Sequence, residues 1–279
     1  MINWFKKHFI PGPHNDHQPH FLRRKTVFFV LKLVLIIELL FLIELLWLAP
    51  FTNFFSAILS NVLVDLTNID RQNNNLSILT TNPLLEEAAN LKASDMAQKG
   101  YFSHTSPDGK TPWEWLDEVG YKFKYAGENL AVNFFDSNDI ERAWMNSTGH
   151  RKNILSENFT EIGIATARGI YKGREAIFVV QYFGKPAKAK VITTTASLAL
   201  ENPFAKSSLI ERAFVMPKTI STYIYLFIAL IVVVALILKF FIKIKVQYPK
   251  LVFNGVIVLF VIISVLYLNT LLIGKGYVF

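Results

Sequence analysis

The sequence predicts a mixed α/β domain joined to three transmembrane α-helices. Two uncharged apolar runs, residues 219–238 and 251–274, are 20 and 24 residues long, and each is long enough to cross a bilayer as a helix. A third apolar segment, residues 26–48, lies near the N-terminus. The polar section between it and the other two carries both helix and strand patterns. These observations argue against a purely soluble protein.

The composition supports this class and excludes several others. Hydrophobic residues make up 52% of the chain and charged residues 18%, whereas an ordinary globular domain has about 25% charged residues. The absence of cysteine excludes disulfide bonds, thiolate metal ligands and a cysteine nucleophile. Residues 57–186 carry 13 basic and 16 acidic side chains, so the net charge of +8 resides elsewhere in the chain. A nucleic-acid partner is not expected, because it would require a basic surface on the folded domain.

The N-terminal part is predicted to be a cytoplasmic tail without fixed structure, residues 1–25, followed by the first transmembrane helix, residues 26–48. Glu38 lies near the middle of that helix. We expect it to be protonated or to pair with a polar group on another helix, such as Asn254 or Asn269. An ion or proton pathway through Glu38 is the alternative. Likewise, a metal-binding tail is the alternative for the four tail histidines, which are His8, His14, His17 and His20.

Residues 219–242 and 251–273 are predicted to be the second and third transmembrane helices, and residues 187–216 a linker. Lysine and arginine residues precede the first span and recur in residues 239–250. The positive-inside rule places both of these basic stretches in the cytoplasm. The predicted localisation is therefore a multi-pass protein of the cell membrane, with residues 57–186 on the extracytoplasmic side.

Local signals divide residues 57–186 into helices and strands. Asn82 is a typical helix N-cap residue, Pro83 suits the first helical position, and Gly100 suits the end of that helix. Helical periodicity or start signals predict further helices at residues 57–72, 111–119 and 137–145. Strand patterns occur at residues 129–134, 161–167 and 176–183. Helices and short strands in this number predict a mixed α/β domain with helices packed against a small sheet.

Ordered blocks of sequence stand out in the same section. They are YFSHTSPDG at residues 101–109, AGENLA at 126–131, AWMNSTGHRKNIL at 143–155, GIA at 163–165 and VQYFG at 180–184. Together they resemble the bacterial branch of the CAP superfamily, also called SCP-like, which groups cysteine-rich secretory proteins, insect venom antigen 5 and plant pathogenesis-related proteins. The resemblance covers roughly residues 57–186, and the three spans and the tails lie outside it.

The resemblance implies an α-β-α sandwich, an extracytoplasmic location and a cleft lined by two histidines and two acidic residues. Three of those four residues carry over to this sequence, as His104, Glu128 and His150. The second acid of the family pattern lies three positions after a tryptophan. Counted from Trp144, that position is Ser147 here. The complete set of four is therefore not expected in this chain.

Three interpretations of His104, Glu128 and His150 remain open. Two neutral imidazoles and a carboxylate are a known ligand set for a divalent metal such as zinc, with water at the fourth position. Such a water could attack a carbonyl or an ester, which would make the protein a metal-dependent hydrolase. In the third interpretation, Glu128 orients both rings in a hydrogen-bonded network without a metal. Whether the protein is an enzyme stays open, because the sequence identifies no catalytic residue.

The function predicted is that of a binding or scaffold module anchored at the cell envelope, with or without a metal in the cleft. The expected partners are the membrane itself and an envelope glycan, lipid or protein. The alternative is a metal-dependent hydrolase that uses His104, Glu128 and His150, with a divalent metal such as zinc as its cofactor.

Overall fold

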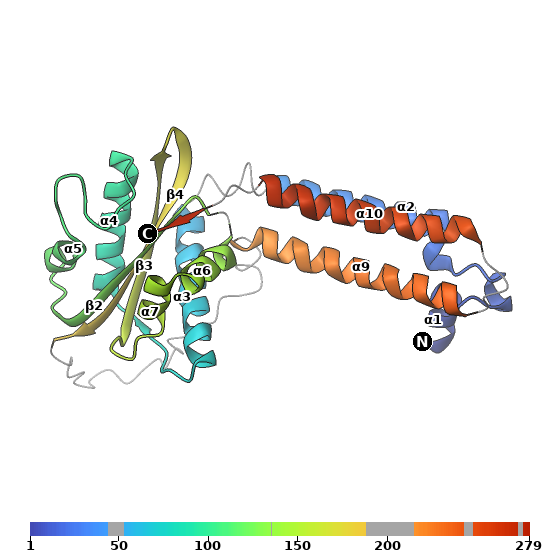
Figure 1. Ribbon diagram of the computed structural model, residues 1–279, viewed down its shortest axis with the longest axis horizontal. Coiled ribbons are helices and arrows are strands. Elements are labelled where there is room, and N and C mark those ends of the chain that lie inside the picture. The colour runs from blue at the N-terminus through green and yellow to red at the C-terminus, as the bar shows by residue number, and fades with distance from the viewer. Residues whose placement is uncertain (44–52, 135, 188–214, 243–247, 273–275) are drawn as a thin grey trace. The chain divides into compact units, whose positions relative to one another are not determined.

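The computed structural model describes residues 1–43, 53–134, 136–187, 215–242, 248–272 and 276–279 (Figure 1). The chain divides into two compact units. The first, named the helical unit, comprises Met1–Leu48 and Lys218–Ile273. The second, named the sheet unit, comprises Ala49–Pro217 and Gly274–Phe279. Each unit has a hydrophobic core of its own.

The helical unit is built on three long apolar helices. They are α2 (Arg24–Ile43), α9 (Pro217–Phe241) and α10 (Pro249–Leu272). All three are long and apolar enough to cross a membrane, in agreement with the three helices that the sequence predicts. The last five residues of the predicted span 26–48, and nearly all of the predicted linker 187–216, lie outside the described residues.

Glu38 forms polar contacts within the largely apolar helical unit. The Tyr225 hydroxyl donates a hydrogen bond to Glu38 Oε2 at 2.8 Å, and Asn269 Nδ2 donates to the same oxygen at 3.2 Å. The predicted pairing of Glu38 with Asn269 is confirmed, and Tyr225 is an additional partner. Asn254 instead donates to the Leu22 carbonyl at 2.9 Å. Glu38 is thus bonded to two helices that follow it in the chain.

The N-terminal segment is folded, so the expectation of a tail without fixed structure is wrong. It forms helix α1 (Ile2–Phe9) and the short 3-10 helices η1 (Pro13–Asn15) and η2 (His20–Leu22). Asn15 Nδ2 donates to the carbonyls of Lys7 and Ile10 at 3.0 and 2.8 Å. Phe9 and Leu22 are buried together with residues of α9 and α10. These contacts join distant residues, so they leave no periodic pattern in the sequence.

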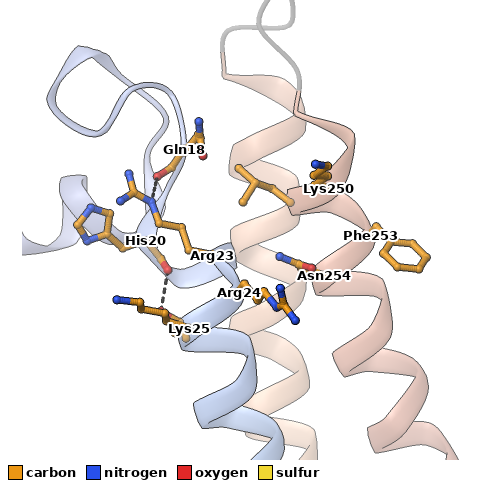
Figure 2. A pocket seen from close by; sticks show the side chains of 10 residues that line it. Gln18, His20, Arg23, Arg24, Lys25, Lys250, Phe253 and Asn254 are labelled. Atoms are coloured by element: carbon orange, nitrogen blue, oxygen red, sulfur yellow. Dashed lines mark hydrogen bonds between the residues drawn. The ribbon is translucent and has the colours of Figure 1, made fainter.

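Basic side chains surround a cavity of about 650 Å³ in the helical unit (Figure 2). The lining includes Arg23, Arg24, Lys25 and Lys250, from the start of α2 and the start of α10. Arg23 is fixed there, since its Nε donates to the Gln18 carbonyl at 3.0 Å. The cavity therefore brings together the two basic stretches that the positive-inside rule assigns to the same side of the membrane.

Within the described residues, the sheet unit contains five α-helices. They are α3 (Asn53–Asn73), α4 (Pro83–Lys99), α5 (Pro112–Glu118), α6 (Ser137–Asn146) and α7 (Thr148–Ile154). As predicted, Asn82 caps α4 by accepting a hydrogen bond from the Leu84 backbone N–H at 2.9 Å. Gly100 ends α4 in the left-handed conformation, with φ of 69°. Helix α7 is not predicted, because its seven residues are too few for a periodic pattern.

The sheet has five described strands in the order β1-β3-β4-β2-β5. They are β1 (Thr80–Thr81), β2 (Phe123–Val132), β3 (Glu161–Tyr171), β4 (Arg174–Pro186) and β5 (Tyr277–Val278). Strand β1 runs parallel to β3, and the other neighbours are antiparallel. Strand β2 starts six residues before the predicted strand 129–134, because its first half pairs with the end of β4. Strand β5 is not predicted, since two residues after an apolar span carry no strand pattern.

Helices cover both faces of the sheet, as in the predicted α-β-α sandwich (Figure 1). Helices α4 and α5 pack on one face, where Met96 and Trp115 meet Leu130 of β2. Helices α3, α6 and α7 lie on the other face (Figure 1). Because side chains alternate along a strand, Glu128 points to the face of α4, as Leu130 does, and Asn129 points to the opposite face. Strand β2 therefore presents different chemistry on its two sides.

Candidate functional site

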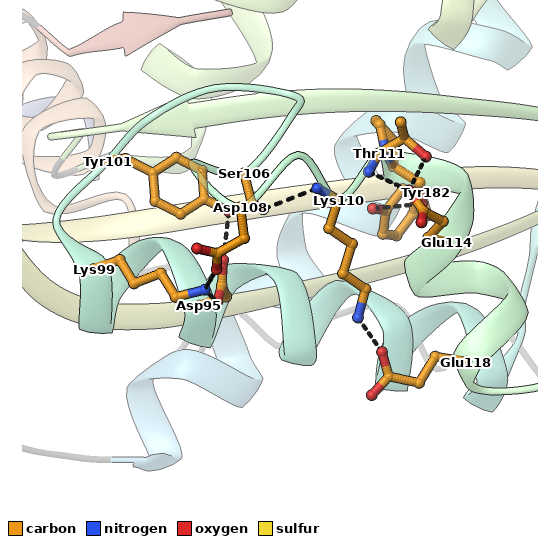
Figure 3. A network of polar contacts seen from close by, with 11 residues as sticks. Asp95, Lys99, Tyr101, Ser106, Asp108, Lys110, Thr111, Glu114, Glu118 and Tyr182 are labelled. Atoms are coloured by element: carbon orange, nitrogen blue, oxygen red, sulfur yellow. Dashed lines mark hydrogen bonds and ion pairs between the residues drawn. The ribbon is translucent and has the colours of Figure 1, made fainter.

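His104 lies in the loop between α4 and α5, and a network of polar contacts holds this loop (Figure 3). The Tyr101 hydroxyl donates to Asp95 Oδ2 at 2.6 Å. Lys99 forms ion pairs with Asp95 at 2.6 Å and with Asp108. Burial and the hydrogen bond to Asp95 raise the pKa of Tyr101 well above its ordinary value, so this hydroxyl stays a donor. The network fixes the two ends of the loop segment that carries His104.

Lys92 of α4 also holds this loop, through hydrogen bonds to two of its residues. This lysine is fully buried, and its Nζ donates to the His104 carbonyl at 2.7 Å and to the Tyr101 hydroxyl at 3.2 Å. Burial lowers the pKa of Lys92, and the carboxylates of Glu128 and Asp95 oppose that shift. Lys92 therefore fixes the His104 backbone and places a positive charge near Glu128.

Glu128 holds the His104 ring. Its Oε1 and His104 Nδ1 form a hydrogen bond. Only 2% of the Glu128 side chain is exposed, against 38% of the His104 side chain. Because β2 starts earlier than predicted, Glu128 lies within the strand rather than at its start. A buried carboxylate therefore orients an imidazole that solvent can reach.

The second carboxylate oxygen of Glu128 is less well satisfied. Oε2 is buried and accepts no hydrogen bond of ordinary geometry from the residues that the structure describes. Tyr182 lies directly opposite Glu128 on β4. Its hydroxyl donates to the Pro112 carbonyl at 3.2 Å. Burial and the nearby carboxylate together raise the pKa of Tyr182 well above its ordinary value, so Tyr182 remains a neutral neighbour of Glu128.

The sequence predicts a loop at His150, after the predicted helix 137–145, but the structure places this residue on helix α7. Its Nδ1 forms a hydrogen bond with Ser147 Oγ at 2.7 Å. Ser147 stands where the family pattern has its second acid, so a hydroxyl here contacts the histidine in place of a carboxylate. Burial lowers the pKa of His150, and the nearby His104 lowers it further. The Phe279 backbone opposes these two effects and raises the pKa.

A buried row of polar side chains supports β2 on the side of His150. Asn153 Nδ2 donates to Asn129 Oδ1 at 2.9 Å, and Asn129 Nδ2 donates to Gln181 Oε1 at 2.8 Å. Gln181 Nε2 then donates to Thr67 Oγ1 at 2.9 Å. The Thr67 hydroxyl bonds to Glu141, whose pKa burial raises well above its ordinary value. The sequence assigns these residues no role, and the one signal is that Asn129, Asn153 and Gln181 fall within the sequence blocks.

The two histidines approach β2 from its opposite faces. His104 bonds to Glu128, which points to the face of the sheet that α4 covers. His150 lies on α7, on the other face, and its backbone carbonyl accepts a hydrogen bond from Asn129 Nδ2 at 3.4 Å. One edge of β2 pairs with β4 along most of its length. At the opposite edge, only the last two residues of β2 pair with β5. The site therefore combines two imidazoles, one carboxylate and a stretch of strand edge.

The contacts of the three predicted ligands favour a hydrogen-bonded network. His104 Nδ1 is engaged by Glu128, and His150 Nδ1 by Ser147. Over the described part of the chain, no group of three or more His, Asp or Glu side chains is arranged to hold a metal ion. The metal-ligand role of His104, Glu128 and His150, with zinc as the candidate cofactor, stays a prediction.

Similarity to known proteins falls on the sheet unit. Residues 64–183 match the CAP family, described as the cysteine-rich secretory protein family. The chain is 40% identical to YkwD of Bacillus subtilis (strain 168) over 123 residues, which are 44% of this chain and 46% of YkwD. It is 35% identical to the membrane protein YlbC of the same strain over 109 residues, which are 39% of this chain and 32% of YlbC.

A similar solved structure is that of an extracellular protein with an SCP domain from Bacillus anthracis. Its sequence identity to this chain is 34% and its TM-score is 0.42, with 49% of this chain and 44% of that chain covered. An outer surface protein of Borrelia burgdorferi has 27% identity and a TM-score of 0.40, with 45% of this chain and 90% of that chain covered.

The sheet unit is thus an SCP-like domain with an α-β-α sandwich fold. The chain combines this CAP domain, matched over residues 64–183, with three apolar helices. This confirms the resemblance seen in the sequence blocks. The chain spans less than half the length of the curated relatives it matches.

Proposed function

We propose that this protein holds its CAP domain on the extracytoplasmic side of the membrane and binds a ligand of the cell envelope there. The observation that carries the proposal is the pair formed by the partly exposed His104 and the buried Glu128, in a domain joined to apolar helices. Buried polar atoms in folded domains almost always have hydrogen-bond partners. Glu128 Oε2 has none of ordinary geometry among the described residues, and a ligand that donates to it would satisfy it.

Two features support the proposed orientation. The basic residues around the cavity of the helical unit are those typical of a cytoplasmic end. In addition, β5 joins the same sheet as β4, although α9 and α10 lie between them in the chain. If both helices cross the membrane, the chain returns to the side that it left. Residues 276–279 and the CAP domain then share one side, opposite the basic end.

We propose an envelope glycan, lipid or protein as the ligand. Residues 57–186 have more acidic than basic side chains, which disfavours nucleic acid. The site offers two imidazoles that donate or accept hydrogen bonds. The rings of His104 and Phe102 both contact the Phe279 ring, which indicates an apolar surface at the site. A ligand with amide or hydroxyl groups next to an apolar portion suits these features.

The test uses the full chain in lipid nanodiscs. It is incubated with purified peptidoglycan, with phospholipid vesicles and with solubilised envelope proteins. We expect retention of one of these classes, and a loss of affinity of about tenfold or more in His104→Ala and in Glu128→Gln, corresponding to about 1.4 kcal/mol. The control is Glu157→Ala, at an exposed position of the CAP domain. Retention of none of the three classes, or equal retention by His104→Ala and the unaltered protein, would contradict the proposal.

A further inference from the structure

Residues 276–279, which follow α10 in the chain, belong to the sheet unit, which contains the CAP domain, and not to the helical unit. Strand β5 pairs antiparallel with the outer edge of β2, with Ala131 opposite Val278 and Val132 opposite Tyr277. The backbone N–H of Phe279 continues the pairing by donating to the Leu130 carbonyl at 3.3 Å. Without this segment, β2 would be an edge strand, with unpaired backbone groups open to another extended chain.

Phe279 extends from β5 to both histidines. The centroid of its ring is 5.4 Å from that of His104 and 6.0 Å from that of Phe102. Its backbone lies close enough to His150 to oppose the lowering of the pKa of that ring by burial. Phe279 therefore contacts His104 through its ring and lies near His150 through its backbone. The candidate ligand site is already occupied by a segment of the chain itself.

The segment also fits its surroundings at two other positions. A Cβ atom at Gly276 would lie 2.3 Å from the Phe134 ring, so any other residue would force the ring or the segment to move. The Tyr277 ring lies 5.3 Å from Lys172 Nζ, on the hairpin between β3 and β4, within the range of a cation–π contact. These contacts place the segment in one register on β2.

We propose that the histidine site is a receptor for an extended peptide with an aromatic side chain, and that residues 276–279 occupy it as an internal ligand that an external peptide must displace. Addition of a strand to a sheet edge gives affinity through the main chain, and side-chain pockets give selectivity. The inference rests on the proposed function and narrows its ligand classes to a protein segment.

The internal ligand is held weakly enough to be displaced. Its pairing with β2 involves two residues, and Tyr277 and Phe279 remain 51% and 53% exposed. An occupied site lowers the apparent affinity for an external ligand by the fraction of time that the site is open. Removing residues 276–279 should therefore strengthen the binding of an external peptide.

The first experiment tests the position of the segment. The native chain has no cysteine, so the double variant Ala131→Cys/Val278→Cys can form only one intramolecular disulfide. Directly opposed residues of antiparallel strands have Cα atoms about 4.5–5.5 Å apart, within the range that a disulfide requires. We expect this bond to form in the full chain in nanodiscs under mild oxidation. Val132→Cys/Tyr277→Cys is a second pair, should the first disturb folding.

The control is Glu157→Cys/Val278→Cys, which combines the same β5 position with an exposed residue of the CAP domain that does not pair with it. Disulfide formation by both opposed pairs, or by one of them, and not by the control supports the inference. Failure of both opposed pairs in folded protein overturns it.

The second experiment tests displacement with a fluorescent Gly-Tyr-Val-Phe peptide. We expect it to bind the full chain lacking residues 276–279, and to bind the disulfide-locked chain at least about tenfold more weakly. The substitution Gly276→Val, which places side-chain atoms against Phe134, should open the site like the deletion. A Gly-Tyr-Val-Ala peptide should bind the deleted chain more weakly, because it lacks the ring that contacts His104. Equal binding to the deleted and locked chains overturns the inference.

The two proposals fail in different ways. If the disulfide forms but neither the native nor the deleted chain retains an envelope component, the position of the segment is supported and the proposed function is contradicted. If the disulfide does not form and an envelope component is still retained through His104, the function stands and the internal ligand is excluded. Retention of peptidoglycan or vesicles alone, unaffected by the locking disulfide, would also overturn the peptide assignment.

Discussion

The helical unit and the CAP domain each hold a glutamate by hydrogen bonds, but the two carboxyl groups have different partners. In the helical unit, Glu38 accepts hydrogen bonds from Tyr225 and Asn269, which lie on two other helices. In the CAP domain, Glu128 bonds to His104, whose ring is partly exposed, and its second oxygen lacks a partner of ordinary geometry among the described residues. Glu38 therefore joins helices, whereas Glu128 supports the candidate binding site.

The largest effect is expected where the buried polar row of the CAP domain is broken. In Asn129→Leu, the side-chain oxygen Oε1 of Gln181 and the side-chain Nδ2 of Asn153 each lose a partner in the domain interior. We expect a loss of about 2–4 kcal/mol in the free energy of unfolding, since each unsatisfied buried group costs about 1–3 kcal/mol. Denaturant unfolding of the full chain in detergent measures it. A loss no larger than that of the exposed control Glu157→Ala would show that the row does not support the domain.

The next largest effect depends on pH. Burial raises the pKa of Glu141, and Asp70 beside it adds to the shift. The stability associated with a raised carboxyl pKa is present in full below the unfolded-state pKa and is lost as the pH rises through the folded-state pKa. Glu141→Gln removes this titration. We expect its stability relative to the unaltered protein to increase from pH 5 to pH 8 by about 1–2 kcal/mol, because one pKa unit corresponds to about 1.4 kcal/mol.

The same series of denaturant titrations, at several pH values, gives this difference. An unchanged difference between Glu141→Gln and the unaltered protein across the range would mean that Glu141 does not titrate on unfolding. Glu157→Gln is a matched control, because this glutamate is exposed in the same domain.

A smaller effect is expected in the helical unit. Glu38→Leu removes the acceptor of two interhelical hydrogen bonds, from Tyr225 and Asn269. Such bonds in membrane helices contribute about 0.6 kcal/mol each, so we expect a loss of about 1 kcal/mol, and less in Glu38→Gln, which keeps an acceptor oxygen. Thermal unfolding in detergent, followed by helical circular dichroism, measures this. A loss as large as that of Asn129→Leu would remove the distinction between the two units.

The smallest effect concerns His150. Its lowered pKa means that the unfolded chain binds more protons than the folded chain just below neutral pH, so stability should fall as the pH drops below about 6.5. We expect a change below about 1 kcal/mol, because solvent screens this partly exposed ring. The pH dependence should become weaker in His150→Gln. An unchanged pH dependence in that variant would show that another group titrates.

Local features of the fold follow from the sequence, and long-range ones do not. The start of α4 at Asn82 and Pro83 and its end at Gly100 are set by residues next to each other in the chain. Strand β5 depends on β2, which lies far away in the sequence, and its two residues carry no pattern. Helix α7 is hidden for a related reason, since a seven-residue helix depends on tertiary contacts more than on periodicity.

The site was only partly predictable for the same reason. The sequence blocks pointed to His104 and Glu128, and the structure joins these two by a hydrogen bond. No spacing rule could have placed His150 and His104 on opposite faces of β2, because the faces are defined by pairing with β4. In the N-terminal segment, the sequence predicts a tail without fixed structure, but the buried Asn15 holds its residues in place by hydrogen bonds to the carbonyls of Lys7 and Ile10.

The most direct measurement is the accessibility of single cysteines in intact cells. Because the native chain has no cysteine, Glu157→Cys in the CAP domain and Lys6→Cys before the first span each report one position. A membrane-impermeant maleimide should label Glu157→Cys in intact cells and Lys6→Cys only after lysis. Labelling of Lys6→Cys in intact cells, with Glu157→Cys reacting only after lysis, would contradict the proposed placement of the CAP domain.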